Sequence, residues 1–472
     1  MRTYCFFAGF VLALSPLVGP AANAQPVPAS PEAAGEAPKE ALGAAQAPGL
    51  AQYQREALAQ NLALAGKELE KQRRAAEVRV VRSAYYPTVD LSARYTHFFF
   101  GGLDLGALFN PVYGTLNQVT GQAGFPTDLQ LRLPPALDAK VELAQPLYIP
   151  ALSTAQKLAG LSQQASQVEL DLVRREIIAG LRTAYLGHAR AAQVAALLRE
   201  TRALLEENLR VSQQLVAADK QTGDVVFRAR AELAAHDQLL RQVEEAQRAA
   251  ARAVNSLRGV SLDSPVEAPP RLSVPAALPV ALAASLRDAI SARTELRLLG
   301  VGRSVVSAER ELIKTGSLPT VALALSYGVQ ASDITPTFSD DFATVSLLAS
   351  WNLYNGGKDA RRGRVKELEL SALDVRRRQL LDQIAVEVHD AHGAAEVSLH
   401  AVASAQERVR SAQAVYDIVS KKYAVGAVPQ IEVIAARTAL LQARTDQITA
   451  ATDTHLRLVE LERVTETQGS LR

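Results

Sequence analysis

The sequence predicts a mainly α-helical protein with a smaller β contribution, built as two similar halves. Its 472 residues include one Trp, one Met and one Cys, and 5% are aromatic, which favours long helices over several aromatic-rich cores. Residues 151–218 contain no proline, so one long helix can run through them. The stretch YYPTVDLSARY (residues 85–95) has a counterpart, SLPTVALALSY (residues 317–327), 232 positions later (319 − 87). A short strand that occurs twice at this distance indicates a duplicated unit.

Residues 1–24 are predicted to be a signal peptide that is cleaved after Ala24. Arg2 precedes an apolar run at residues 5–14, and Ala22-Asn23-Ala24 forms an A-x-A cleavage site. The run is too short to span a bilayer, which disfavours the alternative of a membrane anchor. The only cysteine, Cys5, lies inside the signal peptide, so no lipid anchor on a mature N-terminal cysteine is expected. Residues 25–48 are rich in Pro and Ala and are predicted to be a flexible leader.

The duplication extends over most of the remaining chain. We expect a first structural repeat at residues 49–270, a second at 271–466, and a short tail at 467–472. Two repeats of this length are too few and too long for a solenoid, so they indicate a duplicated half. Pairs of matching positions include Ala57 with Ala289, Leu64 with Leu296, Ile177 with Ile384, and Leu181 with Val388.

Each repeat is predicted to run helix, strand, loop, strand, very long helix, turn, long helix. The first helices are expected at about residues 51–84 and 282–315, each as one piece. The helical hairpins are expected at about 151–259 and 358–465, with turns at 218–224 and 425–430 that contain glycine. At 1.5 Å per residue, a helix of about 68 residues is roughly 100 Å long. Coiled-coil spacing recurs at Leu170, Val173, Ile177, Leu181 and Ala184.

Four strands are expected, at about residues 87–97, 136–146, 319–329 and 343–353. In the first, apolar and polar side chains alternate, so each kind occupies one face. Strands of about ten residues match the length of a tilted strand that spans a bilayer. A soluble hairpin with one buried face is the alternative. The connection at 96–136 shows no helical periodicity, and its residues 98–100, three phenylalanines, suit an aromatic girdle or a hydrophobic patch.

Four strands cannot close on themselves, since the smallest bacterial outer-membrane barrels have eight. The edges of such a sheet must therefore pair with other copies of the chain. The sequence thus predicts an oligomer.

Taken together, these features resemble the TolC-like outer-membrane efflux protein (outer membrane factor) family. The similarity rests on the duplicated strands, on AQPLYIP matched by SWNLYNGGK, and on KKYAVGAVPQIEVIAARTALLQAR, and it covers about residues 50–466. It implies a homotrimer with a 12-stranded β-barrel in the outer membrane, continued by a 12-helix α-barrel across the periplasm. Such proteins are passive exit ducts of tripartite efflux pumps or type I secretion systems. Many relatives are lipid-anchored, and this chain departs from that pattern.

The resemblance also implies partners. We expect contact with outer-membrane lipid, with a periplasmic adaptor (membrane fusion protein), and through it with an inner-membrane transporter. No enzymatic activity, catalytic residue, cofactor, metal or nucleic-acid partner is expected. The formal net charge of +2 agrees with the last point.

In the family, closure lies at the helical tips, where a Tyr and an Arg hold neighbouring coils and acidic residues ring the lumen. Tyr423, Gly426 and Glu432 stand at family positions, whereas Val428 replaces the Arg and Ala435 replaces the second acid. The resemblance therefore implies a gate that is weaker or built differently.

The first tip departs from the family as well. Its turn contains Lys220, a displaced Gly223, and Asp224 at the start of the returning helix. We expect Lys220 or Tyr423 to supply the missing restraint. The alternative for Glu432 and Asp224 is a purely local role, because acids stabilise helix N-termini.

The barrel lumen is expected to be charged on the side of the first repeat only. The second repeat offers uncharged residues there: Ala322, Ala324, Ser326, Thr344, Ser346 and Ser350. The lumen residues from the first repeat are Asp90, Arg94, Asp138, Lys140 and Glu142.

Three other functions fit the sequence less well. A periplasmic coiled-coil adaptor would have one hairpin flanked by lipoyl-like β-structure, and this sequence has two hairpins. A solute-specific porin would need a barrel closed within one chain. An enzyme is disfavoured because G-x-S-x-G, H-E-x-x-H and G-x-x-x-x-G-K are absent. His389, His392 and Glu396 have a spacing that suits a metal, but His392 matches the packing position of Tyr185, which favours a structural role.

Overall fold

A computed structural model describes residues 48–97, 99, 103–129, 132–133, 136–269, 272–331, 340–425 and 427–466. The predicted signal peptide, nearly all of the leader, and Gly426 lie outside these residues. Of the three phenylalanines at 98–100, only Phe99 is described, and it is exposed.

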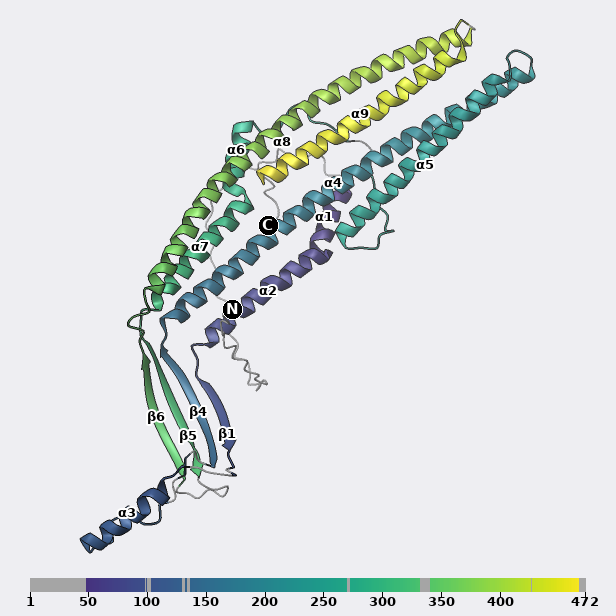
Figure 1. Ribbon diagram of the computed structural model, residues 1–472. Coiled ribbons are helices and arrows are strands. Elements are labelled where there is room, and N and C mark those ends of the chain that lie inside the picture. The colour runs from purple at the N-terminus through teal and green to yellow at the C-terminus, as the bar shows by residue number, and fades with distance from the viewer. Residues whose placement is uncertain are drawn as a thin grey trace, which may run out of the picture. The chain divides into compact units, whose positions relative to one another are not determined.

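Both repeats run from two short helices through two long strands to two long helices, and the first repeat has β2, α3 and β3 in addition between its long strands (Figure 1). The helices of the first repeat are α1 (Pro48–Gln60), α2 (Leu62–Ser83), α3 (Leu105–Thr120), α4 (Pro150–Ala217) and α5 (Asp224–Arg258). Those of the second repeat are α6 (Leu282–Ala292), α7 (Thr294–Thr315), α8 (Lys358–Ala424) and α9 (Gln430–Thr465). The strands are β1 (Thr88–Tyr95), β2 (Leu103–Asp104), β3 (Arg132–Leu133), β4 (Leu137–Tyr148), β5 (Thr320–Ala331) and β6 (Asp341–Ser350).

One antiparallel sheet contains the four long strands in the order β1-β4-β5-β6. The central pairing of β4 with β5 joins the two repeats, and the register opposes Lys140 to Gly328 and Glu142 to Ser326. The strands overlap the predicted ranges, but β6 ends one residue before Trp351, whose indole N–H donates to the Ser317 carbonyl over 3.0 Å. The short strands β2 and β3 form a separate two-stranded sheet in the β1–β4 connection.

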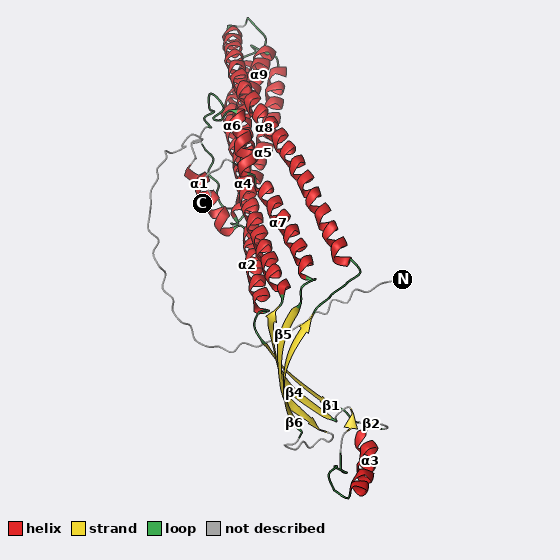
Figure 2. Cartoon of the chain, turned by 90° about the vertical axis from the view of Figure 1, so that its left-hand side faces the viewer, coloured by secondary structure: helices red, strands yellow, loops and turns green. Residues whose placement is uncertain are grey.

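The long helices form two antiparallel hairpins, α4 with α5 and α8 with α9, and α4 also packs against α9 (Figure 1). The shorter helices α2 and α7 lie along α4, and α7 lies along α8 as well. Figure 2 shows the strands continuing from the ends of these helices. No helix in the described part of the chain is both long and apolar enough to cross a membrane.

Each repeat has its own hydrophobic core. Ile177 and Leu181 of α4 are buried in one, and their matching positions Ile384 and Val388 of α8 are buried in the other. Ala57 and its match Ala289 are fully buried in the same two cores. The spacing that repeats in the sequence is therefore the spacing of the packed seams.

The first helix of each repeat is broken, and the expectation of a single helix was wrong in both. In the first repeat Asn61 is extended (φ −66°, ψ 123°), and its side-chain oxygen accepts the backbone N–H groups of Ala63 and Leu64 at 2.9 and 3.3 Å. This caps α2, because the first N–H groups of a helix have no partner within it. Arg293 occupies the matching place and is also extended (φ −54°, ψ 120°).

The β1–β4 connection contains a helix, α3, which the sequence pattern did not predict. Pro111 stands within it, in a segment rich in Gly and aromatics that has the composition of a loop. Hydrogen bonds outside the helix, described below, hold this segment in place. Figure 1 shows α3 beyond the end of the sheet that lies away from the long helices.

Candidate functional site

The two faces of the four-stranded sheet differ in chemistry. Residues opposite one another in an antiparallel pair share a face, so the register places all five predicted lumen residues on one face. Asp90 opposes Glu142, and Arg94 opposes Asp138. The other face has Val89, Leu91, Tyr95, Val141, Tyr327, Val345 and Leu347, all exposed.

The polar face holds two ion pairs. Arg94 donates to Asp138 over 3.0 Å across the strands, and Lys140 donates to Glu142 over 2.8 Å. Asp90 has no ion pair among the described contacts, so the face carries three acids against two bases. Both pairs are well exposed on at least one side, so each contributes at most about 1 kcal/mol to stability.

The polar face continues onto the second repeat without charge. On β5, Ser326 lies opposite Glu142 and Gly328 lies opposite Lys140. On β6, Thr344 lies opposite Ser326 and Phe342 lies opposite Gly328. Phe342 and Leu348 share this face with the predicted small and hydroxyl residues, and the sequence analysis had not included them. A Cβ on Gly328 would lie 2.3 Å from the Ala139 carbonyl oxygen, so only glycine allows β4 and β5 to approach this closely.

At the first helical tip, helix α4 ends in a turn that backbone hydrogen bonds define. Asp219 adopts a left-handed conformation (φ 49°), and the N–H of Lys220 donates to the Leu215 carbonyl over 2.9 Å. This is a Schellman ending of α4, usually formed with glycine. The expected turn glycine, Gly223, instead precedes α5 with an ordinary φ of −61°.

Asp224 has the local contacts of a helix-start residue. It accepts a hydrogen bond from the Thr222 hydroxyl and pairs with Arg228 over 3.2 Å. The Thr222 hydroxyl is the main cause that lowers the pKa of this carboxyl from its usual value. Lys220 is exposed, and its side chain has no hydrogen bond or ion pair with the described residues, so a restraint through it stays a prediction.

The second tip ends α8 in a similar way, since the Ala427 N–H donates to the Lys422 carbonyl over 2.9 Å. Tyr423 is half-buried, and Glu432 is exposed in the first turn of α9, where its N–H donates to the Pro429 carbonyl over 3.1 Å. Their roles in a gate stay predictions, as does that of Gly426.

The two hairpins are joined near their tips by residues that the sequence analysis missed. Arg437 of α9 pairs with Glu232 of α5, and both side chains are largely buried. Closer to the tips, Gln430 donates to the Ser212 hydroxyl over 3.4 Å, and both residues are buried. The sequence feature that indicates this contact is Arg437, a charged residue on the buried side of α9.

The seam between α4 and α9 continues with ion pairs. Arg182 pairs with Glu462, and Arg190 pairs with Asp453 over 3.6 Å. Between these pairs lie two buried histidines, His188 on α4 and His455 on α9.

Both histidines are held toward the neutral form. Burial lowers the pKa of the His188 imidazole from its usual value. For His455, burial is the main cause that lowers the pKa, and the charge of Arg182 adds to it.

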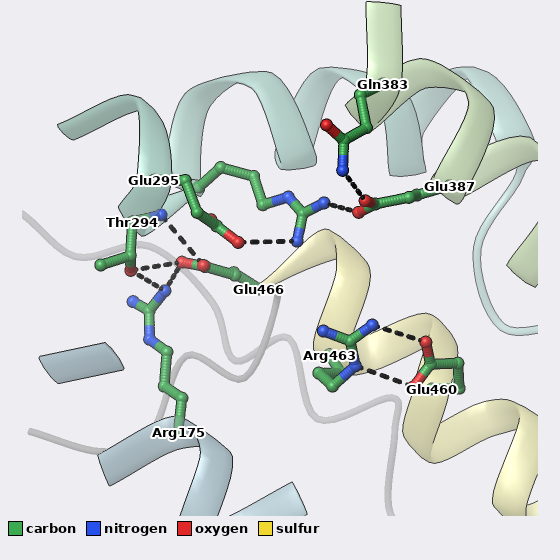
Figure 3. A network of polar contacts seen from close by, with 9 residues as sticks. Arg175, Thr294, Glu295, Gln383, Glu387, Glu460, Arg463 and Glu466 are labelled. Atoms are coloured by element: carbon green, nitrogen blue, oxygen red, sulfur yellow. Dashed lines mark hydrogen bonds and ion pairs between the residues drawn. The ribbon is translucent and has the colours of Figure 1, made fainter. Parts of the chain in front are cut away.

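A polar network gathers where α9 ends (Figure 3). The Glu466 carboxylate accepts the backbone N–H and the hydroxyl of Thr294, each over 2.9 Å, and pairs with Arg175 of α4. Arg175 also donates to the Thr294 hydroxyl over 2.7 Å. Thr294 is the first residue of α7, so Glu466 caps a helix that starts 172 residues earlier in the chain (466 − 294).

Arg293, at the break between α6 and α7, extends this network to Glu295 and Glu387. Only 3% of its side chain is exposed, and it pairs with Glu387 of α8 and, over 3.3 Å, with Glu295. Gln383 donates to Glu387 over 2.8 Å. The network therefore fixes α4, α7, α8 and the end of α9 to one another.

The side chains of the candidate histidine cluster lie in different environments. His389 and Glu396 are exposed, whereas the His392 Nε2 lies 3.3 Å from the Val280 carbonyl. Within the described ranges, no three His, Cys, Asp or Glu side chains are grouped as metal ligands.

The fold is that of outer-membrane channels. Among solved structures, CusC matches with a TM-score of 0.70 at 15% identity, covering 88% of this chain and 92% of its own. The CmeC outer membrane channel of Campylobacter jejuni matches with a TM-score of 0.72 at 14% identity, covering 89% and 85%. The MtrE outer membrane channel of Neisseria gonorrhoeae, in an open state, matches with a TM-score of 0.68 at 15% identity, covering 89% of each chain.

Residues 286–466 match the sequence model of the family described as outer membrane efflux protein. No curated protein matches the chain. The resemblance drawn from the sequence is confirmed: residues 286–466 match the model of the outer membrane efflux protein family, and the structures similar in fold are outer-membrane channels.

Proposed function

We propose that this chain is one protomer of a homotrimeric exit duct in the outer membrane, serving a tripartite efflux pump or a type I secretion system. The observation that carries the proposal is the four-stranded sheet with two open edges. Neither β1 nor β6 has a further partner strand among the described residues, and both are exposed along nearly their whole length. Such edges are templates for pairing with another chain.

The strand directions allow closure by copies of the chain. Each neighbour in the order β1-β4-β5-β6 is antiparallel, so β1 and β6 run in opposite directions. The β6 strand of one copy can therefore pair antiparallel with β1 of the next. Three copies close a ring of 12 strands, an even number as in bacterial outer-membrane barrels.

The faces of the sheet suit this arrangement. An exposed apolar face is costly in water and favourable against lipid, whereas the face with Asp90, Arg94, Asp138, Lys140 and Glu142 suits a water-filled lumen. With three acids and two bases in each copy, the lumen at this level would have a small negative charge and favour cations.

The helical hairpins would form the periplasmic part, closed at the tips and contacted there by a periplasmic adaptor that connects to an inner-membrane transporter. We place the main restraint within a protomer at Arg437–Glu232, since this buried pair joins the two hairpins near the tip in which Val428 replaces the family's arginine. Tyr423, Gly426 and Glu432 complete the proposed gate from the second tip. Lys220, Gly223 and Asp224 contribute from the first.

The membrane arrangement is tested with adjacent cysteines on opposite faces of β1. Ser92→Cys is expected to react with a water-soluble maleimide in intact proteoliposomes, whereas Leu91→Cys is expected to be protected until detergent is added. The cysteine-free mature chain provides the background. Equal reactivity of the two variants, or a monomer in the water-soluble periplasmic fraction, would refute the proposal.

The gate is tested by single-channel conductance. Arg437→Ala is expected to raise the open fraction, because it leaves Glu232 buried without its partner. Arg408→Ala is the matched control, since Arg408 pairs with Asp446 inside one hairpin and not between hairpins. Glu432→Gln tests cation selectivity in the same recordings. An open fraction equal for the two arginine variants would remove Arg437 from the gate.

A further inference from the structure

Helix α3 exposes an apolar stripe. At 100° per residue, five of its side chains fall within an arc about 100° wide, the width with which surface helices normally face a core. All of them are exposed: Leu108 59%, Phe109 41%, Val112 52%, Leu116 37% and Val119 80%.

The polar side of α3 is covered by the chain itself. Asn110 and Asn117, two turns apart, each exchange a pair of hydrogen bonds with the returning segment. Asn110 donates to the Leu129 carbonyl over 3.0 Å and accepts its N–H over 2.8 Å. Asn117 does the same with Phe125 over 2.7 and 2.9 Å. The amides are therefore satisfied internally, and the apolar stripe is the side left outside.

The segment has no charge along its length. Residues 105–127 contain no Asp, Glu, Lys, Arg or His, and the nearest acidic residues in the sequence are Asp104, directly before α3, and Asp128. Phe109, Tyr113 and Phe125 form an aromatic stack with ring centroids 6.0 and 5.6 Å apart. Tyr113 in the middle of this stack has the amphipathic ring that prefers a membrane–water boundary.

We infer that α3 docks on lipid, with its stripe inserted at the boundary between headgroups and acyl chains. The inference rests on the outer-membrane location proposed above and adds a second membrane contact to that of the sheet. A helix in this position gains from buried apolar area, and basic residues add attraction to anionic lipids. Since α3 has no basic residue, the contact depends on the stripe alone and is insensitive to salt.

A protein partner fits the segment less well. Specific protein interfaces have a polar rim with hydrogen bonds and charge complementarity. Here the asparagines are already bonded and no charged side chain stands within residues 105–127. The aromatic stack and the uncharged stripe are both features of lipid contact.

The test uses single tryptophans in the full chain. Trp351, the only natural one, is replaced by Phe, and a reporter is placed in the stripe (Val119→Trp) or beside it on the same turn (Gln118→Trp). Leu91→Trp on the apolar face of the sheet reports membrane insertion. The trimers are reconstituted into phosphatidylcholine vesicles whose acyl chains are brominated, which quench tryptophan on contact.

We expect Val119→Trp to be quenched about as strongly as Leu91→Trp and at least about twofold more than Gln118→Trp. If Leu91→Trp is quenched and Val119→Trp is not, the α3 inference fails while the proposed function stands. If neither is quenched, the membrane location fails as well. Efficient disulfide formation between copies carrying Val119→Cys would overturn lipid contact in favour of packing between copies.

Discussion

Replacing Glu466 by alanine should release the first turn of α7. The carboxylate accepts two hydrogen bonds from Thr294 at 2.9 Å, and only 5% of its side chain is exposed. Alanine removes both bonds and the pair with Arg175. It also leaves the N–H of Thr294 at a helix start without an acceptor.

The size of the effect follows from these contacts. A hydrogen bond to a charged group contributes about 1.5–3 kcal/mol, so the two from Thr294 contribute about 3–6 kcal/mol. Arg175 is one-third exposed, and its pair adds at most about 1 kcal/mol because water screens it. Partial replacement by water reduces the sum, and we expect a local loss of about 3–4 kcal/mol. Since about 1.4 kcal/mol is a factor of ten, local opening should rise by about 10²–10³.

Hydrogen exchange measures this opening directly, because it reports local as well as global unfolding. Peptides that cover the start of α7 should exchange about 10²–10³ times faster in Glu466→Ala, whereas peptides from the middle of α5 should be unchanged. Glu460→Ala is the matched control: among the described residues, the Glu460 carboxylate accepts hydrogen bonds from Arg463 of the same helix alone, and both side chains are well exposed. Wild-type protection of α7 in Glu466→Ala, or an equal loss in Glu460→Ala, would refute the role of the network.

Three further outcomes are expected. Burial lowers the pKa of His188 and His455, so below a pH of about 6.5 the unfolded chain binds protons that the folded chain does not. The thermal midpoint of unfolding should therefore fall as the pH drops below about 6.5, and replacing both histidines by Gln should flatten this dependence. Gly259→Ala should lower the free energy of unfolding by at least about 1 kcal/mol, because φ is +73° and the new Cβ would lie 2.5 Å from the Gln60 carbonyl oxygen. Gly187→Ala, inside α4, should raise that free energy slightly in the same denaturation assay. Leu181→Ala, in a fully buried site, should cost about 2–5 kcal/mol, and a loss below about 1 kcal/mol would contradict its place in the core.

Much of the fold was accessible from the sequence because its periodicity follows packing. The seam positions Ile177 and Leu181 recur at helical spacing and are buried, as are their matches in the second repeat. Strand alternation placed the five charged residues of β1 and β4 on one face, since the side-chain period of a strand is two, but it did not include Phe342 and Leu348 on that face. In both cases a local pattern and the tertiary environment agree.

The parts that were missed depend on contacts distant in sequence. Helix α3 is held by Asn110 and Asn117, whose partners lie on the returning segment, so the composition of the segment alone indicated a loop. Asn61 is a residue type that often caps helices, and its side chain caps α2, but the apolar pattern continues on both sides of it and so predicted one unbroken helix. Arg437 and Glu232 are brought together only by the packing of one hairpin on the other, and neither stands at a position where the family's residues predicted a restraint.

Because β4 pairs with β5, neither half of the chain contains the whole sheet when it is expressed from a separate gene fragment. A chain cut in the connector at residues 260–281 would yield one piece with β1 and β4 and another with β5 and β6. Each piece would then hold a two-stranded ribbon, which is marginal in water, and would lack its partner at the α4–α9 seam. The two halves are alike in plan but share one sheet and one helical seam, so we expect the two fragments to yield a stable product only when they are synthesised together.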